Sequence, residues 1–211
     1  MRLLTSTLLL AVSATLAGGV QPAWRPVDGH IMTRWAAEVD AGSPWPDYPR
    51  PQLVRTNWMN LNGLWDYAIS DASASVSTNW EGQILVPFPV ESALSGVKKP
   101  LTAQQSLWYR RTFSAGDRPA GHRLLLHFGA VDWEAVVWVN GVRVGAHRGG
   151  YTGFSFDITE HLKPGGENKL VVRVWDPTGT DGSARGKQKL ESIAKPEGYW
   201  YTPCSGIWQT A

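Results

Sequence analysis

The sequence contains a single cysteine, Cys204, and no cluster of charge of either sign. One cysteine cannot form an internal disulfide, so the fold must depend on its hydrophobic core. Cys204 and the five histidines, at positions 30, 122, 127, 147 and 161, lack the spacing of a structural zinc site, and we expect neither a metal nor another cofactor. The 20 Lys and Arg residues are spread along the chain, which argues against a nucleic-acid-binding protein.

Long apolar runs are also missing, except at the amino terminus. Met1-Arg2 gives a positive start, Leu3 to Leu16 is uncharged and apolar, and the small residues 17–19 follow. This pattern is typical of a secretory signal peptide and is too short for a comfortable membrane span. We predict a signal peptide over residues 1–19 and an exported protein, periplasmic or extracellular, that is free of the membrane after cleavage. An uncleaved membrane anchor is the alternative.

Residues 20–55 are rich in proline and tryptophan, most densely at 43–51. Proline lacks the amide donor that a sheet needs and favours extended backbone. We interpret this segment as a lead-in arm, either lying along the surface of a domain or acting as a mobile linker. The domain itself is expected to span residues 56–211.

The expected domain consists of short strands separated by turns. Helical periodicity is scarce, and Pro164-Gly165-Gly166 interrupts the chain where a crossover helix would be needed, so a parallel α/β fold is disfavoured. The residues Asn140-Gly141 stand between two β-rich runs and predict a type I′ hairpin. We therefore predict an all-β jelly-roll β-sandwich, with a closed barrel as the alternative. The expected strands are Leu64–Ile69, Gly82–Val86, Leu107–Phe113, Arg123–Phe128, Ala135–Val139, Val142–Ala146, Phe154–Ile158 and Lys169–Trp175, with a last strand starting at Ile207.

The last strand is expected to be truncated. Ile207 to Ala211 reads as the beginning of a strand with no turn or polar tail after it. An apolar strand edge invites association, so a domain seldom ends in this way. We interpret the chain as a fragment of a longer protein.

Tryptophan is unusually frequent, with 12 residues in 211. Its large flat ring with one polar N–H suits burial in a core as well as stacking on the apolar face of a sugar. As a set, the tryptophans indicate a carbohydrate-binding protein.

Several short motifs occur in an order that resembles the amino-terminal sugar-binding domain of glycoside hydrolase family two, the family of bacterial β-galactosidases and β-glucuronidases. The resemblance covers about residues 49–211. It implies a jelly roll of the galactose-binding-domain type, followed in the full protein by an immunoglobulin-like sandwich and a (β/α)8 barrel. The motifs are Asn60-Leu-Asn-Gly-Leu-Trp65, Val86-Pro-Phe-Pro-Val-Glu91, Leu107-Trp-Tyr-Arg-Arg111, Asp132-Trp133, Trp138-Val-Asn-Gly141, Gly145-Ala-His147, Gly149-Gly150-Tyr151, Phe156-Asp-Ile-Thr159 and Ser205-Gly-Ile-Trp208.

The resemblance implies that the catalytic acid and nucleophile, both glutamates, lie in the barrel. We therefore expect no catalytic residue in this chain. A retaining glycosidase needs two carboxyl groups across the scissile bond, and no pattern singles out two carboxylates here. The glutamates are expected to be solvated or locally hydrogen-bonded at the surface; they are Glu81, Glu91, Glu134, Glu160, Glu167, Glu191 and Glu197.

The long segment 181–201 is the candidate substrate-binding region, because a loop of this length is more often functional than idle. Arg185 or Lys187 could donate hydrogen bonds to sugar hydroxyls, and Trp200 or Tyr201 could stack on a ring. Packing of Trp200 against the barrel is the alternative. Galactosidases and glucuronidases of the family resembled have a sugar-contacting Asp where this chain has Trp200, so the identity of the glycoside stays open.

Three functions remain possible at this stage. The first is the sugar-binding domain of a secreted glycoside hydrolase that cleaves O-glycosyl bonds of a β-glycoside and whose catalytic domain lies outside this chain. The second is a stand-alone carbohydrate-binding module. The third is a structural or adhesive sandwich whose aromatic surface contacts another protein.

Overall fold

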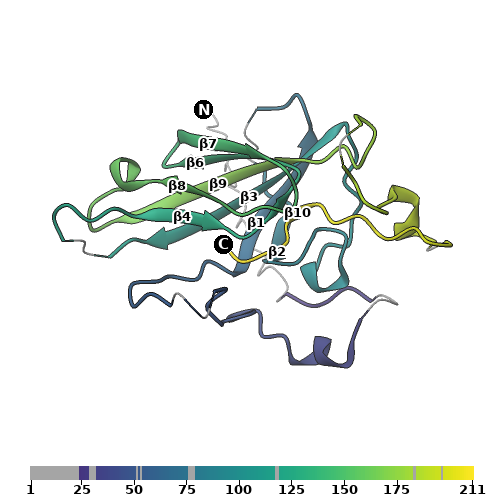
Figure 1. Ribbon diagram of the computed structural model, residues 1–211, viewed down its shortest axis with the longest axis horizontal. Coiled ribbons are helices and arrows are strands. Elements are labelled where there is room, and N and C mark those ends of the chain that lie inside the picture. Colours follow the sequence, from purple (N-terminus) through teal and green to yellow (C-terminus); the bar gives the residue numbers. More distant parts are fainter. Residues whose placement is uncertain are drawn as a thin grey trace, which may run out of the picture.

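The computed structural model describes residues 24–28, 32–50, 52, 54–75, 79–116, 119–182, 184–195 and 197–211. These residues form β-strands and short 3₁₀ helices, and none of them is α-helical (Figure 1). No helix in these ranges has the length and apolar character needed to cross a bilayer. The predicted signal peptide, residues 1–19, lies outside the described residues.

The larger layer is a six-stranded antiparallel sheet with the order β2-β1-β3-β9-β6-β7. Its central pairing joins β3 to β9 over eight residues, with Tyr109 opposite Val172. The sheet strands are β1 (Gly63–Asp71), β2 (Gly82–Val86), β3 (Gln105–Ser114), β6 (Glu134–Val139), β7 (Val142–Arg148) and β9 (Glu167–Trp175).

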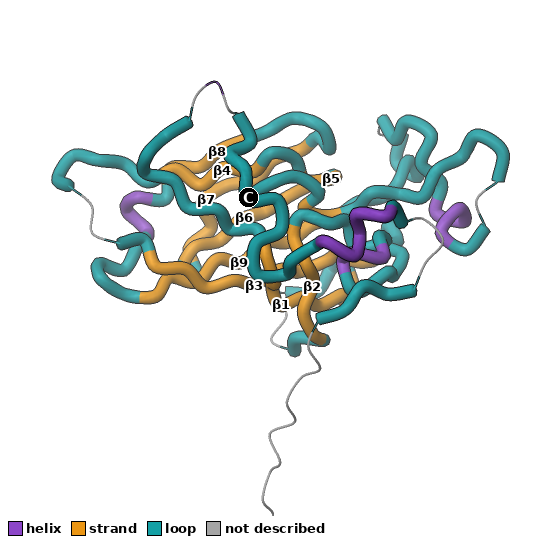
Figure 2. The backbone as a smooth tube through the Cα atoms, turned by 90° about the horizontal axis from the view of Figure 1, so that it is seen from below, coloured by secondary structure: helices purple, strands orange, loops and turns teal. Residues whose placement is uncertain are grey.

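The second layer consists of two short antiparallel ladders that pack over the same core. One joins β4 (Leu125–Phe128) to β8 (Phe154–Asp157), and the other joins β5 (Val131–Asp132) to β10 (Gly206–Ile207). Figure 1 shows these strands against the large sheet, and Figure 2 shows loops and 3₁₀ helices extending from both ends of the strand-rich centre. The predicted all-β sandwich is confirmed.

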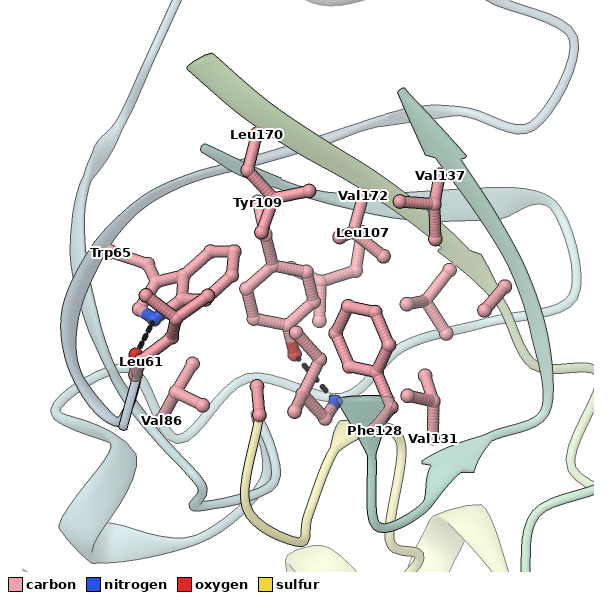
Figure 3. Packing of buried hydrophobic residues seen from close by; sticks show 14 of the residues in the cluster. Leu61, Trp65, Val86, Leu107, Tyr109, Phe128, Val131, Val137, Leu170 and Val172 are labelled. Carbon is pink, nitrogen blue, oxygen red and sulfur yellow. Dashed lines mark hydrogen bonds between the residues drawn. The ribbon is translucent and has the colours of Figure 1, made fainter. Parts of the chain in front are cut away.

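The core lies between the two layers (Figure 3). Trp65 and Tyr109 are 1% and 0% exposed. The polar atom of each side chain is hydrogen-bonded: Trp65 Nε1 donates to Leu61 O at 2.8 Å, and Tyr109 Oη accepts from Ile207 N at 3.2 Å. Burial of one large apolar side chain contributes on the order of 2–3 kcal/mol. Because the polar atoms are hydrogen-bonded, this gain is not offset by an unsatisfied group.

The strands expected from the sequence are present, with ends that differ by up to two residues. The Asn140-Gly141 hairpin is confirmed, because both residues have the positive φ that a type I′ turn requires (51° and 85°). Strand β5 was not expected, since two residues are too few to show a period. The strand expected from Ile207 spans only Gly206–Ile207, and residues 208–211 run on outside regular structure.

The described part of the lead-in arm contacts the sandwich. Val27 N donates to Ala93 O at 2.9 Å, and Asn62 Nδ2 donates to Pro44 O at 3.2 Å. The short 3₁₀ helices are η1 (Arg34–Glu38) in this arm and, further along, η3 (Ala93–Ser95), η4 (Thr159–His161) and η5 (Leu190–Ile193).

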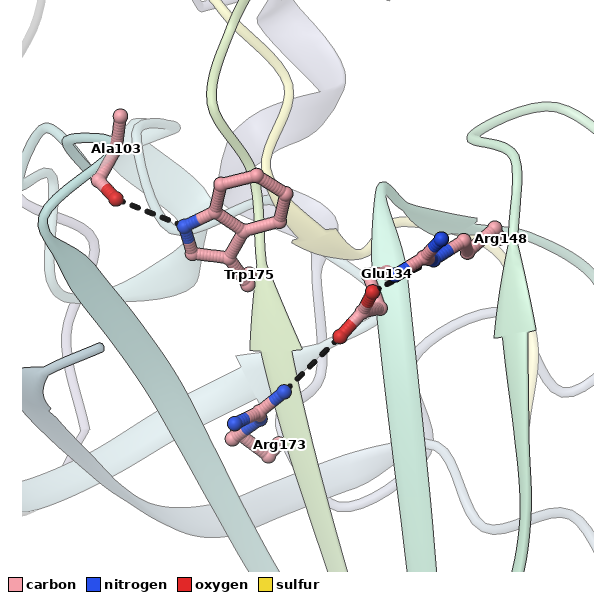
Figure 4. Close-up of polar contacts among 5 residues, drawn as sticks. All are labelled: Ala103, Glu134, Arg148, Arg173 and Trp175. Atoms are coloured by element: carbon pink, nitrogen blue, oxygen red, sulfur yellow. Dashed lines mark hydrogen bonds and ion pairs between the residues drawn. The ribbon is translucent and has the colours of Figure 1, made fainter. Parts of the chain in front are cut away.

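Polar contacts on the outer face hold three strands of the large sheet together (Figure 4). Glu134 on β6 accepts from Arg173 on β9 at 3.0 Å and from Arg148 on β7 at 2.7 Å. Beside them, Trp175 Nε1 donates to Ala103 O at 2.8 Å. These contacts fix the end of the sheet from which the loops of the candidate site leave.

Candidate functional site

The long segment between β9 and β10 folds back on itself through backbone hydrogen bonds. Tyr201 N donates to Lys187 O at 2.8 Å, and Lys189 N donates to Tyr201 O at 3.0 Å, so the chain forms a parallel bridge between Gln188 and Tyr201. This frame places the strand-like pieces 187–189 and 199–201 side by side. All four residues predicted to bind substrate, Arg185, Lys187, Trp200 and Tyr201, are therefore brought to one place.

The two predicted cations lie over aromatic rings of the same segment. The Arg185 guanidinium carbon is 5.1 Å from the ring centroid of Trp200, and Lys187 Nζ is 6.0 Å from that of Tyr199. Among the described residues, neither cation forms an ion pair with a carboxylate. Both side chains carry N–H donors beside these rings.

Three exposed tyrosines, Tyr151, Tyr199 and Tyr201, lie near these cations, and together with the half-buried Trp200 they form what we call the aromatic platform. The three tyrosines are 59%, 61% and 64% exposed, and the ring of Trp200 lies 4.8 Å from that of Tyr199. Exposed rings that lie close together mark a candidate interaction surface. Flat rings beside cationic N–H donors are suited to a ligand that has both an apolar face and hydroxyl groups.

Gln188 connects the platform to the sandwich. Its Nε2 donates to Tyr151 Oη at 3.2 Å and to Asp132 Oδ2 at 3.4 Å, and its Oε1 accepts from Cys204 N at 2.5 Å. One amide side chain thus contacts β5, the loop after β7 and the approach to β10. It fixes the position of the frame relative to the strands.

Asp132 lies below Gln188 and is 5% exposed. Burial, together with the neighbouring charge of Asp176, raises the pKa of Asp132 to about 7, while the hydrogen bond from Gln188 opposes the rise. Gly150 makes room for this carboxyl group, because a Cβ at that position would lie 2.4 Å from Asp132 Oδ1. A buried carboxyl that titrates near neutral pH beside a loop is typical of functional sites.

Two further carboxyl groups hold Ser205 from opposite sides. Ser205 N donates to Glu91 Oε2 at 2.9 Å, and Ser205 Oγ donates to Asp176 Oδ2 at 2.6 Å. Glu91 is 3% exposed, so the expectation that it lies at the surface is wrong. Burial raises the pKa of Glu91 to about 8; the hydrogen bonds from Ser205 oppose this rise, and the charge of Asp176 adds to it slightly. Burial also raises the pKa of Asp176.

Sequence reasoning did not assign a role to Asp132, Tyr151 or Gln188. Asp132 and Tyr151 stand in the motifs Asp132-Trp133 and Gly149-Gly150-Tyr151, but the sequence spacing does not indicate that both residues contact Gln188. Gln188 directly follows Lys187, one of the two predicted cations. Within the ranges that the structure describes, no group of three His, Cys, Asp or Glu residues is arranged to hold a metal ion.

Comparison with known families finds one match that covers most of the domain. Residues 58–189 match "Glycosyl hydrolases family 2, sugar binding domain". The chain is 30% identical over 159 residues to a β-glucuronidase of Paenibacillus borealis, covering 72% of this chain and 26% of that protein. It is 48% identical over 68 residues to a β-galactosidase of Thermoanaerobacter pseudethanolicus, covering 32% of this chain and 9% of that one. The chain thus spans about a quarter or less of these relatives.

The fold also resembles that of a solved relative. The β-glucuronidase of Faecalibacterium prausnitzii superposes with a TM-score of 0.50 at 22% sequence identity, over 72% of this chain and 30% of that one. At this identity the likeness is one of fold.

Proposed function

Because the chain belongs to glycosyl hydrolase family 2 and carries its sugar-binding domain, we propose that it forms the substrate-facing front of a longer, exported glycosidase that hydrolyses β-glycosides. The aromatic platform and its two cations, Arg185 and Lys187, contact the sugar. Further domains of the same polypeptide, an immunoglobulin-like sandwich and a barrel, supply the catalytic glutamates. The glycosidase relatives, several times longer than this chain, support this arrangement.

The observation that carries the proposal is the platform itself. Tyr199 and Tyr201 are 61% and 64% exposed and can offer ring faces to the apolar C–H side of a sugar, whereas Trp200 is half-buried and contacts the Arg185 guanidinium and the Tyr199 ring. Arg185 and Lys187 add N–H donors, and among the described residues neither forms an ion pair. Carbohydrate sites combine these two features, since a sugar ring has an apolar face and a polar rim.

The carboxylates of this chain support a non-catalytic role. Retaining hydrolysis needs two carboxyl groups about 5–5.5 Å apart across an open cleft. Here Glu81 forms an ion pair with Lys99. Glu134 forms ion pairs with Arg148 and Arg173. Glu91 is buried and accepts a hydrogen bond from Ser205 N. Glu134 links three strands of the large sheet, whereas the exposed pair of Glu81 with Lys99 contributes little to stability.

Sugar binding is tested with the 211-residue chain and a panel of β-galactosides, β-glucuronides and their oligosaccharides, using NMR titration. We expect Trp200→Ala and Tyr201→Ala to raise Kd about five- to tenfold, the loss of one stacking contact. Trp35→Ala is the matched control, because Trp35 is 55% exposed on η1, outside the platform. Equal loss in all three variants, or no binding by the parent chain, contradicts the proposal.

Turnover separates the domain from a complete enzyme. The chain alone is expected to release little or no nitrophenol from nitrophenyl β-glycosides, and turnover abolished by mutating one of its own carboxylates would overturn this. A stand-alone carbohydrate-binding module is the second candidate. The DNA after codon 211 decides between them: a second sandwich and a barrel with two glutamates support the glycosidase, and a stop codon supports the module.

A further inference from the structure

A buried carboxyl group lies where the frame of residues 187–189 and 199–201 meets the sandwich. Asp132 belongs to the two-residue strand β5, is 5% exposed, and is covered from the loop side by Gln188. Among the described residues, the hydrogen bond to this carboxyl group comes from Gln188 Nε2 at 3.4 Å. A charge-assisted bond to a carboxylate is normally about 2.7–2.9 Å long, so this long contact fits a neutral acid better than a charged one.

The carboxyl groups behind Asp132 add charge of the same sign. Asp176 and Glu91 are 4% and 3% exposed, and both accept hydrogen bonds from Ser205. Ser205 precedes Gly206, the residue that pairs with Asp132. Three buried carboxyl groups therefore surround the point at which the segment after the frame joins β10.

No described cation offsets these charges. Among the described residues, none of the three carboxyl groups forms an ion pair. Arg148 lies over the ring of Trp133, next to Asp132, but its guanidinium is paired with Glu134. Ionising Asp132 here therefore costs free energy unless water reaches it. The other titratable groups that face the cluster are Tyr109 on β3, Tyr151 after β7, Asp181 after β9 and Cys204 before β10.

Water reaches Asp132 when the frame lifts from the sandwich. The Gln188 side chain holds the frame down through its bonds to Asp132, to Tyr151 Oη and to Cys204 N. The bonds between Lys187, Lys189 and Tyr201 are backbone bonds within the frame. Loss of the Gln188 contacts thus exposes Asp132 to solvent while the frame keeps its own structure.

We propose that Asp132 is a pH-sensitive switch for the aromatic platform: the frame stays on the sandwich while this carboxyl group carries its proton and lifts when the proton is released. The switch rests on the proposed function in one respect, that the residues it moves contact the sugar. With the frame lifted, Tyr199, Trp200 and Tyr201 lose their fixed position relative to Tyr151.

The direction of the switch follows from the surroundings of Asp132. In the closed state, burial and the charge of Asp176 raise its pKa from 3.8 to about 7, and solvation in the lifted state restores the usual value. The closed state is therefore favoured most below pH 3.8 and loses this advantage as the pH rises through 7. From pH 5 to pH 8 we expect the ratio of closed to lifted frame to fall roughly a hundredfold.

The test measures amide hydrogen exchange in the 211-residue chain from pH 5 to pH 8. Each rate is divided by that of an unstructured peptide at the same pH, because exchange itself accelerates with pH. The Cys204 amide, which donates to Gln188 Oε1, reports the frame, and the Val172 amide in the centre of the large sheet reports global unfolding. We expect Cys204 to be less protected than Val172 at every pH, and its protection to fall roughly a hundredfold over this range.

Three variants assign the fall to Asp132. Asp132→Asn has a similar shape and no proton to release, so its Cys204 protection should change by less than about threefold. Glu197→Gln, an exposed carboxyl in the same segment, is the matched control and should follow the parent chain. Glu91→Gln should keep the fall at Cys204, because Glu91 does not contact the frame.

Several results would overturn the switch. They are a fall that persists in Asp132→Asn, a fall that Glu91→Gln abolishes instead, and equal protection of Cys204 and Val172 in the parent. If Asp132→Asn does not fold, the parent decides, since the Asp132 carboxyl ¹³C resonance must titrate with the same midpoint as the loss of protection. Different midpoints refute the proposal.

The exchange experiment contains no sugar, so a chain that binds no glycoside can still show the switch. Glycoside binding that is equally tight at pH 5 and pH 8 would contradict the switch and leave the proposed function intact.

Discussion

The buried carboxyl of Glu91 predicts that this domain loses stability as the pH rises. Glu91 is 3% exposed, and its Oε1 has no hydrogen-bond partner among the described residues. Burial penalises the charged form, so the pKa rises from 4.5 to about 8 in the folded state. Between these values the folded protein holds a proton that the unfolded chain has released. The contribution to stability is therefore complete below pH 4.5 and is lost progressively as the pH rises through 8.

The size of the effect follows from the shift. One unit of pKa corresponds to about 1.4 kcal/mol, so the shift of Glu91 corresponds to roughly 4–5 kcal/mol between acidic and alkaline conditions. The variant Glu91→Gln places a neutral amide at the same position and has no proton to lose. We expect the free energy of unfolding of this variant, relative to the parent, to rise by a few kcal/mol from pH 5 to pH 9.

Urea unfolding followed by tryptophan fluorescence, at pH values from 5 to 9, measures this difference. Glu160→Gln is the control, because Glu160 is exposed in η4 and its side chain is solvated in both states. The control should follow the pH slope of the parent chain. Parallel slopes for the parent and Glu91→Gln would refute the reasoning, since the buried carboxyl would then be charged in the folded protein without penalty.

Three other substitutions test the surroundings of the site. Gly150→Ala places a Cβ 2.4 Å from Asp132 Oδ1 and should lower the free energy of unfolding by about 1–3 kcal/mol. An unchanged urea midpoint would contradict this, because it would mean that the loop after β7 moves to remove the clash. Gln188→Ala removes the hydrogen bonds of this side chain with Asp132 Oδ2, Tyr151 Oη and Cys204 N. We expect faster hydrogen exchange at residues 199–201 and unchanged exchange in the core. Unchanged exchange at residues 199–201 would contradict the inference that Gln188 fixes this loop to the strands. Glu134→Gln weakens the half-buried pair with Arg173 and should cost about 1 kcal/mol in thermal unfolding, less at high salt; a salt-independent loss would point to packing instead.

The sequence predicted those parts of the fold that depend on neighbouring residues. The Asn140-Gly141 turn is one, because its conformation depends on two adjacent residues that tolerate positive φ. The strands of the large sheet are another, since their apolar residues alternate or run together over enough positions to be recognised. The two-residue strand β5 carries no such signal, and only its pairing with β10 makes it a strand.

The candidate site was predicted in part. Arg185, Lys187, Trp200 and Tyr201 lie within one segment, so composition alone brought them together, and their roles stay predictions. The contact between Glu91 and Ser205 could not be predicted from residues that are close in the sequence. Glu91 and Ser205 are 114 residues apart, and whether two such residues meet depends on how the whole chain folds.

The bridge between Lys187–Lys189 and Tyr201 is made by main-chain atoms. A substitution changes a side chain but leaves the backbone N–H and C=O in place, except where proline is introduced. The side chains of this loop can therefore be exchanged during evolution while their spacing stays the same. Under the proposed function, related chains can therefore diverge in ligand preference at these positions without first having to evolve a new loop.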